Sequence, residues 1–221
     1  KMPTVAQGSQ VTVGIFEPAH AWVEHPDFAT RGGPRAFKGD ADPYDVHWHP
    51  TGVAGLIGGA GHESVNEGGE PYEFRGVAPR IGLLTFAYGL DSSWTENFRS
   101  DALQAAEQDM VDIMNNSWGR SNCADYAYGS YEGLSPFLDS LVRGDVGHPI
   151  VAVFSAGNTR RGFRVNDVLD QSCIESGEGI FPNYRSINYP KSAKNSIVVG
   201  AIDSWTNRVA AYSAWGPTLD G

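Results

Sequence analysis

The chain has 221 residues, of which 41% are hydrophobic and 19% are charged, and its formal net charge is -10. This composition supports a buried core and argues against disorder. The acidic balance argues against a nucleic-acid partner, because phosphate binding needs clustered Lys and Arg. We expect no membrane partner, since no apolar run approaches the ~20 residues that cross a bilayer. No signal peptide opens the chain, which predicts a protein that is either cytosolic or already processed.

Predicted strands and helices alternate along the chain. Val11–Phe16 is a β-rich run ended by Glu17-Pro18, which predicts a buried strand. Pro50 suits the first turn of a helix, and apolar residues follow it at helical spacing. The other predicted elements are strand Ile81–Ala87, helix Asn97–Gln108, strand Met110–Met114, helix Ser135–Arg143 with Ser135 as N-cap, and strands Pro149–Phe154 and Ser196–Ile202.

The predicted helix after Pro50 is rich in glycine. Gly52, Gly55 and Gly58 each cost it about 1 kcal/mol relative to Ala. Such a cost makes sense where the helix lies very close to another element. His49 then sits at or just before the helix N-terminus and faces outward from a rigid support. This stretch alone fits both a catalytic histidine and a surface or capping histidine.

Near-continuous apolar strands that alternate with helices indicate an α/β fold, a doubly wound, mostly parallel sheet with helices on both faces. Sites in such sheets form outside the carboxyl ends of the strands. Polar or very small residues follow three of the predicted strands, at Glu17-Pro18, Asn116–Gly119 and Ser155–Asn158. Ordinary turn chemistry favours the same residue types, so these positions are candidates only.

Six short motifs follow one another across nearly the whole chain. No single motif is specific, but together and in this order they resemble the subtilisin-like serine protease family. The resemblance implies that residues 1–221 form one subtilisin-like catalytic domain of a serine endopeptidase. The motifs are Val11–Glu17 with His25–Phe28, Asp42–Tyr44 with His49–Gly55, Gly76–Pro79, Asn116–Gly119, Ser155–Asn158, and Ser196–Asp203 with Tyr212–Pro217.

The resemblance also implies roles for individual residues. A serine hydroxyl attacks only when an imidazole takes its proton, and an acceptor must hold that imidazole in one tautomer. By resemblance, His49 is the base, Glu17 the orienting acid, and Asn158 the donor to the oxyanion of the tetrahedral intermediate. The residues expected to bind the substrate backbone are Ser117, Trp118 and Gly119, with Ser155, Ala156 and Gly157 in the oxyanion segment.

Two departures from the family pattern concern the base and the acid. The family has Asp where this chain has Glu17, and the extra methylene extends the reach of the carboxylate. Asp45, four residues before His49, is the alternative acid. The family's His-Gly-Thr-His reads His49-Pro50-Thr51-Gly52 here, and His47 lies outside the register expected for the base.

The nucleophilic serine is the third departure. In the family it follows the Trp215–Pro217 segment by several dozen residues, but this sequence ends at Gly221. We therefore expect a catalytic domain incomplete at its C-terminus, truncated or cleaved before the serine segment, and inactive alone. The expected partners are a peptide or protein substrate and a C-terminal fragment that carries the serine. A non-catalytic peptide-binding relative is the alternative. Nucleotide binding by Gly55–Gly61 is disfavoured, because that run follows a loop and no acidic residue is suitably placed.

Cysteines and metals give further expectations. Cys123 and Cys173 lie in polar loops rather than apolar runs, which favours one disulfide and an oxidising compartment. The expected location is therefore secreted or extracellular, with the periplasm included. No cofactor is expected for the reaction and no metal ligand is assigned. The resemblance implies that a structural calcium ion is possible. The acidic segment Glu63–Glu73 is the first candidate for its site, although the spacing of its acidic residues matches no known calcium loop.

Overall fold

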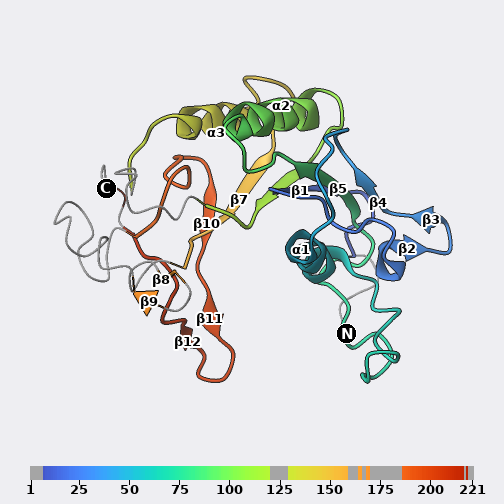
Figure 1. Ribbon diagram of the computed structural model, residues 1–221. Helices are drawn as coiled ribbons and strands as arrows, with labels where there is room; N and C mark the ends of the chain where they lie inside the picture. The colour runs from blue at the N-terminus through green and yellow to red at the C-terminus, as the bar shows by residue number, and fades with distance from the viewer. Residues whose placement is uncertain are drawn as a thin grey trace. The chain divides into compact units, whose positions relative to one another are not determined.

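The computed structural model describes residues 7–119, 129–158, 186–216 and 218, and the backbone of 164–165 and 168–169. The chain forms two compact units (Figure 1). The first comprises Lys1–Asn116 and Gly144–Val151, and the second Ser117–Arg143 and Ala152–Gly221. None of the helices in these described segments is both long enough and apolar enough to cross a bilayer.

The first unit contains parallel strands in the order β6-β1-β5-β4. Strand β1 lies between two neighbours, so both its edges are hydrogen-bonded. Its last residue, Glu17, is in register with Ala87 at the end of β5. The bounds are Thr12–Glu17 for β1, Ala36–Lys38 for β4, Gly82–Ala87 for β5 and Ile113–Asn116 for β6.

Helix α1, Trp48–Gly58, covers one face of this sheet. Side chains alternate between the faces of a strand, so Val13 and Ile15 share a face. They form a buried cluster with Leu83 of β5 and Ala54 of α1. This packing fixes α1 against β1 and β5, the two strands whose carboxyl ends carry Glu17 and Ala87.

Helix α2, Trp94–Glu107, covers the opposite face (Figure 1). Phe16 of β1 points to this side, where its ring stacks on Phe86 at 4.6 Å between centroids. The edge of Phe98 from α2 packs against Phe16 at 5.9 Å. Helices on both faces of a parallel sheet confirm the predicted fold class.

A 3-10 turn, Pro26–Phe28, follows β1 within the motif His25–Phe28. The short strands of the first unit were not predicted, and β2 (Ala29–Thr30) pairs antiparallel with β3 (Gly33–Pro34). Strand β4 was also missed. The expectation that Met110 begins a strand is wrong, because its φ of 50° is incompatible with extended backbone and β6 starts only at Ile113.

The glycines of α1 differ from the expectation of close packing along the whole helix. A Cβ on Gly58 would lie 2.8 Å from Ile81 and 3.1 Å from Leu83, so a close approach exists there. A Cβ on Gly52 or Gly55 would meet nothing within 4 Å. Only the C-terminal glycine of the three therefore serves the packing of helix on sheet.

This contrast gives a matched pair of substitutions. Gly58→Ala is expected to lower the free energy of unfolding by about 1–2 kcal/mol, since overpacking outweighs the gain in helix propensity. Gly55→Ala has open space around it and is expected to raise that free energy by up to about 1 kcal/mol. Urea denaturation of both variants measures the difference, and changes of the same sign would contradict it.

The second unit contains α3, Leu134–Arg143, and a parallel pair of strands. The pair is formed by β10, Ile197–Val199, and by β7, Val151–Ser155, which belongs to this unit from Ala152 onward. Ser135 is not an N-cap as predicted. It lies inside α3, where its buried Oγ is 3.3 Å from the Pro190 carbonyl oxygen. The remaining elements are two antiparallel strand pairs, β8 (Arg164–Val165) with β9 (Val168–Leu169), and β11 (Ile202–Asp203) with β12 (Arg208–Val209).

Candidate active site

Glu17 lies at the carboxyl end of β1 and is 2% exposed. Its Oε1 is buried and has no hydrogen-bond partner among the described residues. Removal from water disfavours the charged form, so burial raises the pKa of Glu17 to about 8. Burial of a carboxyl group costs free energy unless a polar partner compensates for the lost water.

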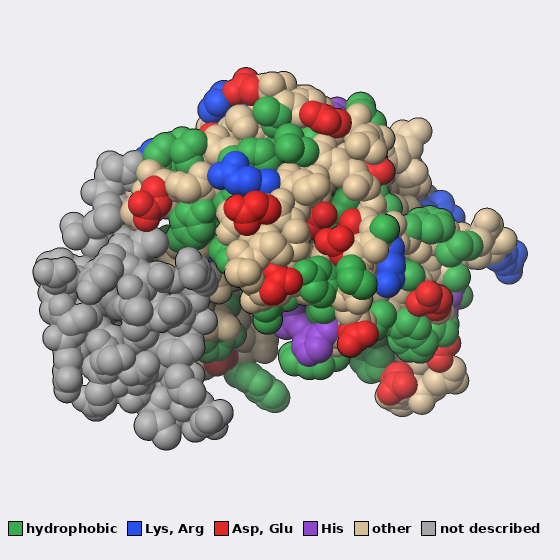
Figure 2. Space-filling view, turned by 45° about the horizontal axis from the view of Figure 1, so that its top comes forward, with side chains coloured by type: hydrophobic (Ala, Val, Ile, Leu, Met, Phe, Trp, Pro, Cys, Tyr) green, Lys and Arg blue, Asp and Glu red, His purple; other side chains and the backbone are tan. Residues whose placement is uncertain are grey.

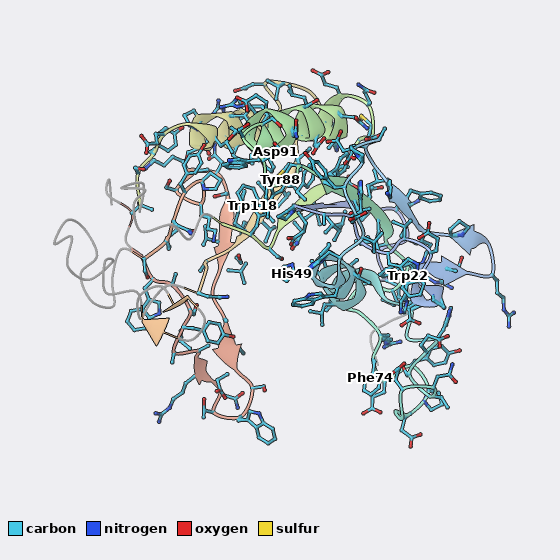
Figure 3. The ribbon with its side chains drawn as sticks, viewed as in Figure 1. Trp22, His49, Phe74, Tyr88, Asp91 and Trp118 are labelled. Carbon is cyan, nitrogen blue, oxygen red and sulfur yellow. The ribbon has the colours of Figure 1, made fainter. Side chains whose placement is uncertain are left out.

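His49 supplies that partner from the first turn of α1. Its Nδ1 lies 3.3 Å from Glu17 Oε2. The side chain of His49 remains 41% exposed, and it projects from the N-terminal end of α1 (Figure 3). Burial of the ring lowers the pKa of His49, and the neighbouring His47 lowers it further. A neutral imidazole with Nδ1 engaged can accept a proton at Nε2.

The start of α1 explains how His49 is held. His47 is the N-cap residue, and its Nδ1 accepts a hydrogen bond of 3.2 Å from the backbone N–H of His49. Pro50 follows within the first turn, where a missing N–H costs nothing. The two neighbouring histidines thus have different environments, because His47 caps the helix and His49 faces the carboxylate.

Asp45, the alternative acid, lines the same pocket of about 440 Å³ as Glu17 and His49. The residue is exposed, and its backbone oxygen accepts a hydrogen bond from the His20 N–H. Among the described residues, the carboxylate within ion-pair distance of His49 is that of Glu17. The structure therefore brings His49 together with the buried acid and not with the exposed one.

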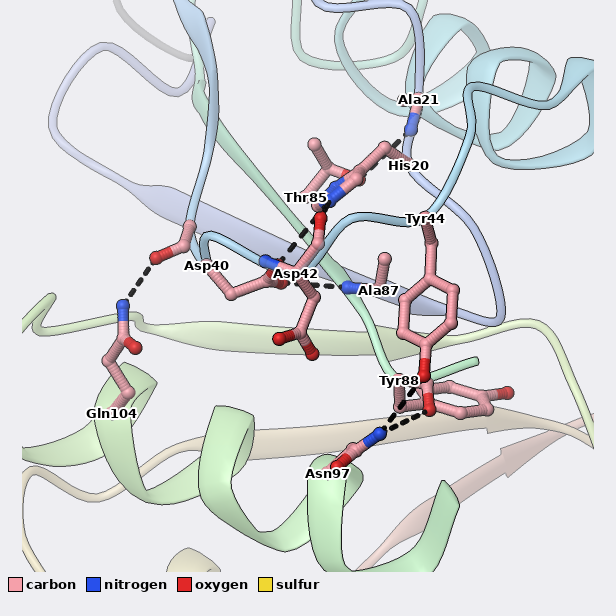
Figure 4. Close-up of polar contacts among 11 residues, drawn as sticks. His20, Ala21, Asp40, Asp42, Tyr44, Thr85, Ala87, Tyr88, Asn97 and Gln104 are labelled. Carbon is pink, nitrogen blue, oxygen red and sulfur yellow. Dashed lines mark hydrogen bonds and ion pairs between the residues drawn. The ribbon is translucent and has the colours of Figure 1, made fainter. Parts of the chain in front are cut away.

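A buried polar network holds the segment that leads into α1 (Figure 4). Asp40 Oδ2 accepts a hydrogen bond of 2.8 Å from the Ala87 N–H, at the end of β5. Asp40 Oδ1 lies 3.3 Å from Nε2 of the fully buried His20. Thr85 Oγ1 accepts from the Ala21 N–H at 3.0 Å. These contacts fix the backbone around the end of β1, and no sequence pattern had indicated them.

Tyr44 anchors the same segment on its other side. Its hydroxyl donates to Asp91 at 3.0 Å and accepts from Asn97 Nδ2 at 3.2 Å. Asn97 also donates to the carbonyl oxygen of Tyr88 (Figure 4). The motif Asp42-Pro43-Tyr44 was the only signal in the sequence that this segment belongs to the site.

The predicted substrate-binding segment Ser117–Gly119 belongs to the second unit. All three residues are half-buried. The ring of Trp118 packs edge-on against Phe154 of β7, with 5.8 Å between centroids and planes at 72°. This contact holds the segment beside the strand that leads to the predicted oxyanion residues.

The predicted oxyanion segment follows β7. The Ala156 N–H donates to the Val199 carbonyl oxygen at 2.7 Å, and the Gly157 carbonyl oxygen accepts from the Ala214 N–H at 2.9 Å. Gly157 has a φ of 103°, which side chains rarely tolerate. Asn158 follows and is exposed. Because Asn158 and His49 belong to different units, their facing one cleft stays a prediction.

A buried lysine beside these segments was missed by sequence reasoning. Lys191 is 2% exposed, and burial lowers the pKa of its ammonium to about 8. A Cβ placed on Gly119 would meet its Nζ, and one on Gly157 would lie 3.2 Å from it. Asn188 Oδ1 lies beside it, buried and without a hydrogen-bond partner among the described residues.

The structural calcium ion stays a prediction. No group of three or more His, Cys, Asp or Glu side chains in the described segments could hold a metal. Within Glu63–Glu73, Glu63 accepts from Asn66 Nδ2 and Glu73 accepts from the Glu70 N–H, so both carboxylates serve local turns. Acidic side chains are spread over the face shown in Figure 2. Cys123 and Cys173 lie outside the described residues, and their pairing stays a prediction.

Comparisons with known proteins find relatives over nearly the whole chain. The model of the peptidase S8 subtilase family matches residues 8–221. Subtilisin DY from Bacillus licheniformis is 26% identical over 216 residues, covering 97% of this chain and 64% of that protein. Subtilisin-like protease 2 from Pseudogymnoascus destructans is 30% identical over 215 residues, covering 96% of this chain and 42% of that protein.

Solved structures show the same fold at lower identity. The serine protease of Aeromonas sobria superposes with a TM-score of 0.64 at 19% identity, covering 96% of this chain and 35% of that one. The MycP3 protease of the type VII (ESX-3) secretion system gives a TM-score of 0.62 at 22% identity, with 95% and 57% covered. The chain thus spans less than two thirds of each of these relatives.

Proposed function

The chain belongs to the subtilase family, and from this premise we propose that it forms part of a serine endopeptidase that hydrolyses peptide bonds through an acid-His-Ser triad. The observation that carries the proposal is the contact between His49 Nδ1 and the buried Glu17 Oε2 at 3.3 Å. This contact leaves Nε2 of a half-exposed ring available to a nucleophile. The serine is supplied by a segment or chain outside these 221 residues.

The proposed reaction follows the usual order of acyl transfer. His49 Nε2 takes the proton of the serine hydroxyl as its oxygen attacks the carbonyl carbon, and later gives it to the leaving amine. Glu17 accepts the Nδ1–H, holds the productive tautomer and stabilises the imidazolium that forms. Asn158 donates its side-chain amide to the oxyanion, while Ser117, Trp118 and Gly119 pair with the substrate backbone.

A fluorophosphonate probe tests the proposal directly. The full-length protein is expected to react covalently at one serine, and Glu17→Gln and His49→Ala variants are expected to react far more slowly. Binding of peptides without any labelling by the probe would instead support a non-catalytic peptide-binding relative. The probe therefore separates the two functions without knowledge of the substrate.

We also propose a secreted or extracellular location and the peptide or protein substrate as partner. The family match and the predicted pairing of Cys123 with Cys173 support an oxidising compartment. No cofactor is proposed for the reaction. Mass spectrometry of the unreduced protein tests the pairing, since two free thiols would contradict it.

Replacement of Asn158 by Ala is expected to lower kcat by about 10²–10³-fold with little change in KM, because one oxyanion donor is lost. Active-site titration gives kcat per folded molecule. A purely structural asparagine would lower stability and leave that value unchanged.

The proposed pair also predicts an alkaline pH profile. The competent state has Glu17 ionised and His49 neutral, and burial raises the pKa of Glu17 to about 8. As the pH falls below 8, a proton binds the pair and kcat/KM is expected to fall about tenfold for each pH unit. A profile of kcat/KM against pH measures this limb. A limb near the ordinary histidine pKa of about 6.5 would contradict it.

A further inference from the structure

The surroundings of Lys191 indicate an anion subsite within the second unit. The residue is 2% exposed, and no carboxylate among the described residues forms an ion pair with its ammonium. A lone buried cation costs free energy, and lysines are almost never fully buried without a partner. An anion that binds beside the ammonium would offset this free-energy cost.

The two glycines define where that anion enters. Nζ of Lys191 lies next to the Cβ positions of both Gly119 and Gly157, so it faces the backbones of the substrate-binding and oxyanion segments together. Neither glycine places a side chain between the ammonium and these backbones. The Lys191 ammonium therefore lies close to both segments.

The segment that carries Lys191 is hydrogen-bonded to α3. The Leu134 N–H at the start of α3 donates to the Tyr189 hydroxyl, and Ser135 Oγ lies 3.3 Å from Ser192 Oγ. These bonds tie both sides of Lys191 to α3. Asn188 adds a second polar group, since an amide can turn either its oxygen or its NH₂ toward a ligand.

We propose that Lys191 binds the carboxylate side chain of the substrate residue whose carbonyl is attacked, so that the enzyme cleaves after Asp or Glu. This inference rests on the proposed function, which places that carbonyl at Asn158 and the peptide backbone along Ser117–Gly119. The side chain next to the attacked carbonyl then enters between the two segments. The lowered pKa of Lys191 fits an ammonium that awaits its counter-ion.

The test compares isosteric substrates on the full-length protein. Fluorogenic peptides that differ only in Glu against Gln, or Asp against Asn, are cleaved by protein whose active sites are counted with a fluorophosphonate. We expect the acidic member of each pair to have a kcat/KM at least about 30-fold higher, the size of a charged hydrogen bond. Lys191→Met is expected to abolish this ratio while the Gln and Asn peptides are still cleaved.

Lys194→Met is the matched control. Lys194 lies three residues away on the same segment, but it is exposed and its ammonium lies 5.3 Å from the Tyr131 ring centre. This variant is expected to keep the full preference for acidic residues. Loss of the ratio in both variants, or no ratio in the unchanged protein, overturns the Lys191 subsite while probe labelling leaves the peptidase standing.

Failure of the proposed function has a different signature. If the probe labels nothing and no peptide is cleaved, the peptidase proposal fails. Calorimetric binding of acetylated Glu and Gln peptides then decides on Lys191 alone. Equal affinities for the two peptides would overturn the subsite in that case too.

Discussion

Glu17→Gln in the full-length protein is expected to lower kcat by about 10⁴-fold, the cost of losing the productive tautomer in a serine protease. Glutamine has almost the shape of a protonated glutamate. Its amide can donate to His49 Nδ1 at the position where Glu17 now accepts, which moves the ring proton to Nε2. An imidazole with a proton on Nε2 cannot take one from serine. Single-turnover kinetics measures the loss.

The same substitution is expected to stabilise the protein at alkaline pH. Burial raises the pKa of Glu17 from 4.5 to about 8, so the folded protein binds the proton more tightly than the unfolded chain. The stabilisation that this proton provides is fully present below pH 4.5 and is lost as the pH rises through 8. Glutamine removes this dependence. The difference in unfolding free energy between the two proteins should change by about 1.4 kcal/mol for each pH unit in this window.

Thermal melts at pH 5 and pH 9 separate the two effects of Glu17→Gln. A variant that loses activity and also melts earlier at pH 9 would mean that the carboxylate stabilises the fold. Glu17→Asp is the control that keeps the charge and shortens the reach. It should recover a large part of the activity lost in the glutamine variant.

His49→Ala is expected to lower kcat by about 10⁵–10⁶-fold, because the residue proposed as general base is removed. His47→Asn is the matched control two residues away. Asn is a good N-cap, so α1 keeps the hydrogen bond to the His49 N–H and the protein should stay within a few-fold of full activity. Equal losses in both variants would contradict the assignment of separate environments to these histidines.

The main strands of the fold could be predicted from long apolar runs in the sequence. Val11–Phe16 and Ile81–Ala87 are apolar because both faces of β1 and β5 are covered by helices. Strand β4 escaped prediction because Ala36–Lys38 is short and follows Gly and Pro, so its pairing depends on β5 and not on its own pattern. The position of Ser135 failed for a related reason, since its burial against Pro190 is tertiary.

The candidate site residues at the strand ends could be predicted only in part from the sequence. Glu17 and His49 stand out because a polar residue ends an apolar strand and another begins a helix. Nothing local could identify Asp40 or Lys191. Their importance comes from partners far away in the sequence, Ala87 for the one and Gly119 for the other. Residues of this kind are found only when three-dimensional contacts are known.

The strand order of the first unit has a consequence for how the protein folds. Each pairing of β1 joins residues remote in sequence, as in Thr12 with Gly82 and Val13 with Ile113. The entropy cost of closing such long loops comes before the contacts that compensate for it, and this makes folding slow. The Glu17–His49 pair needs β1, α1 and the anchored Asp40 segment together, so it is assembled late. A half-folded molecule therefore lacks the contact between Glu17 and His49.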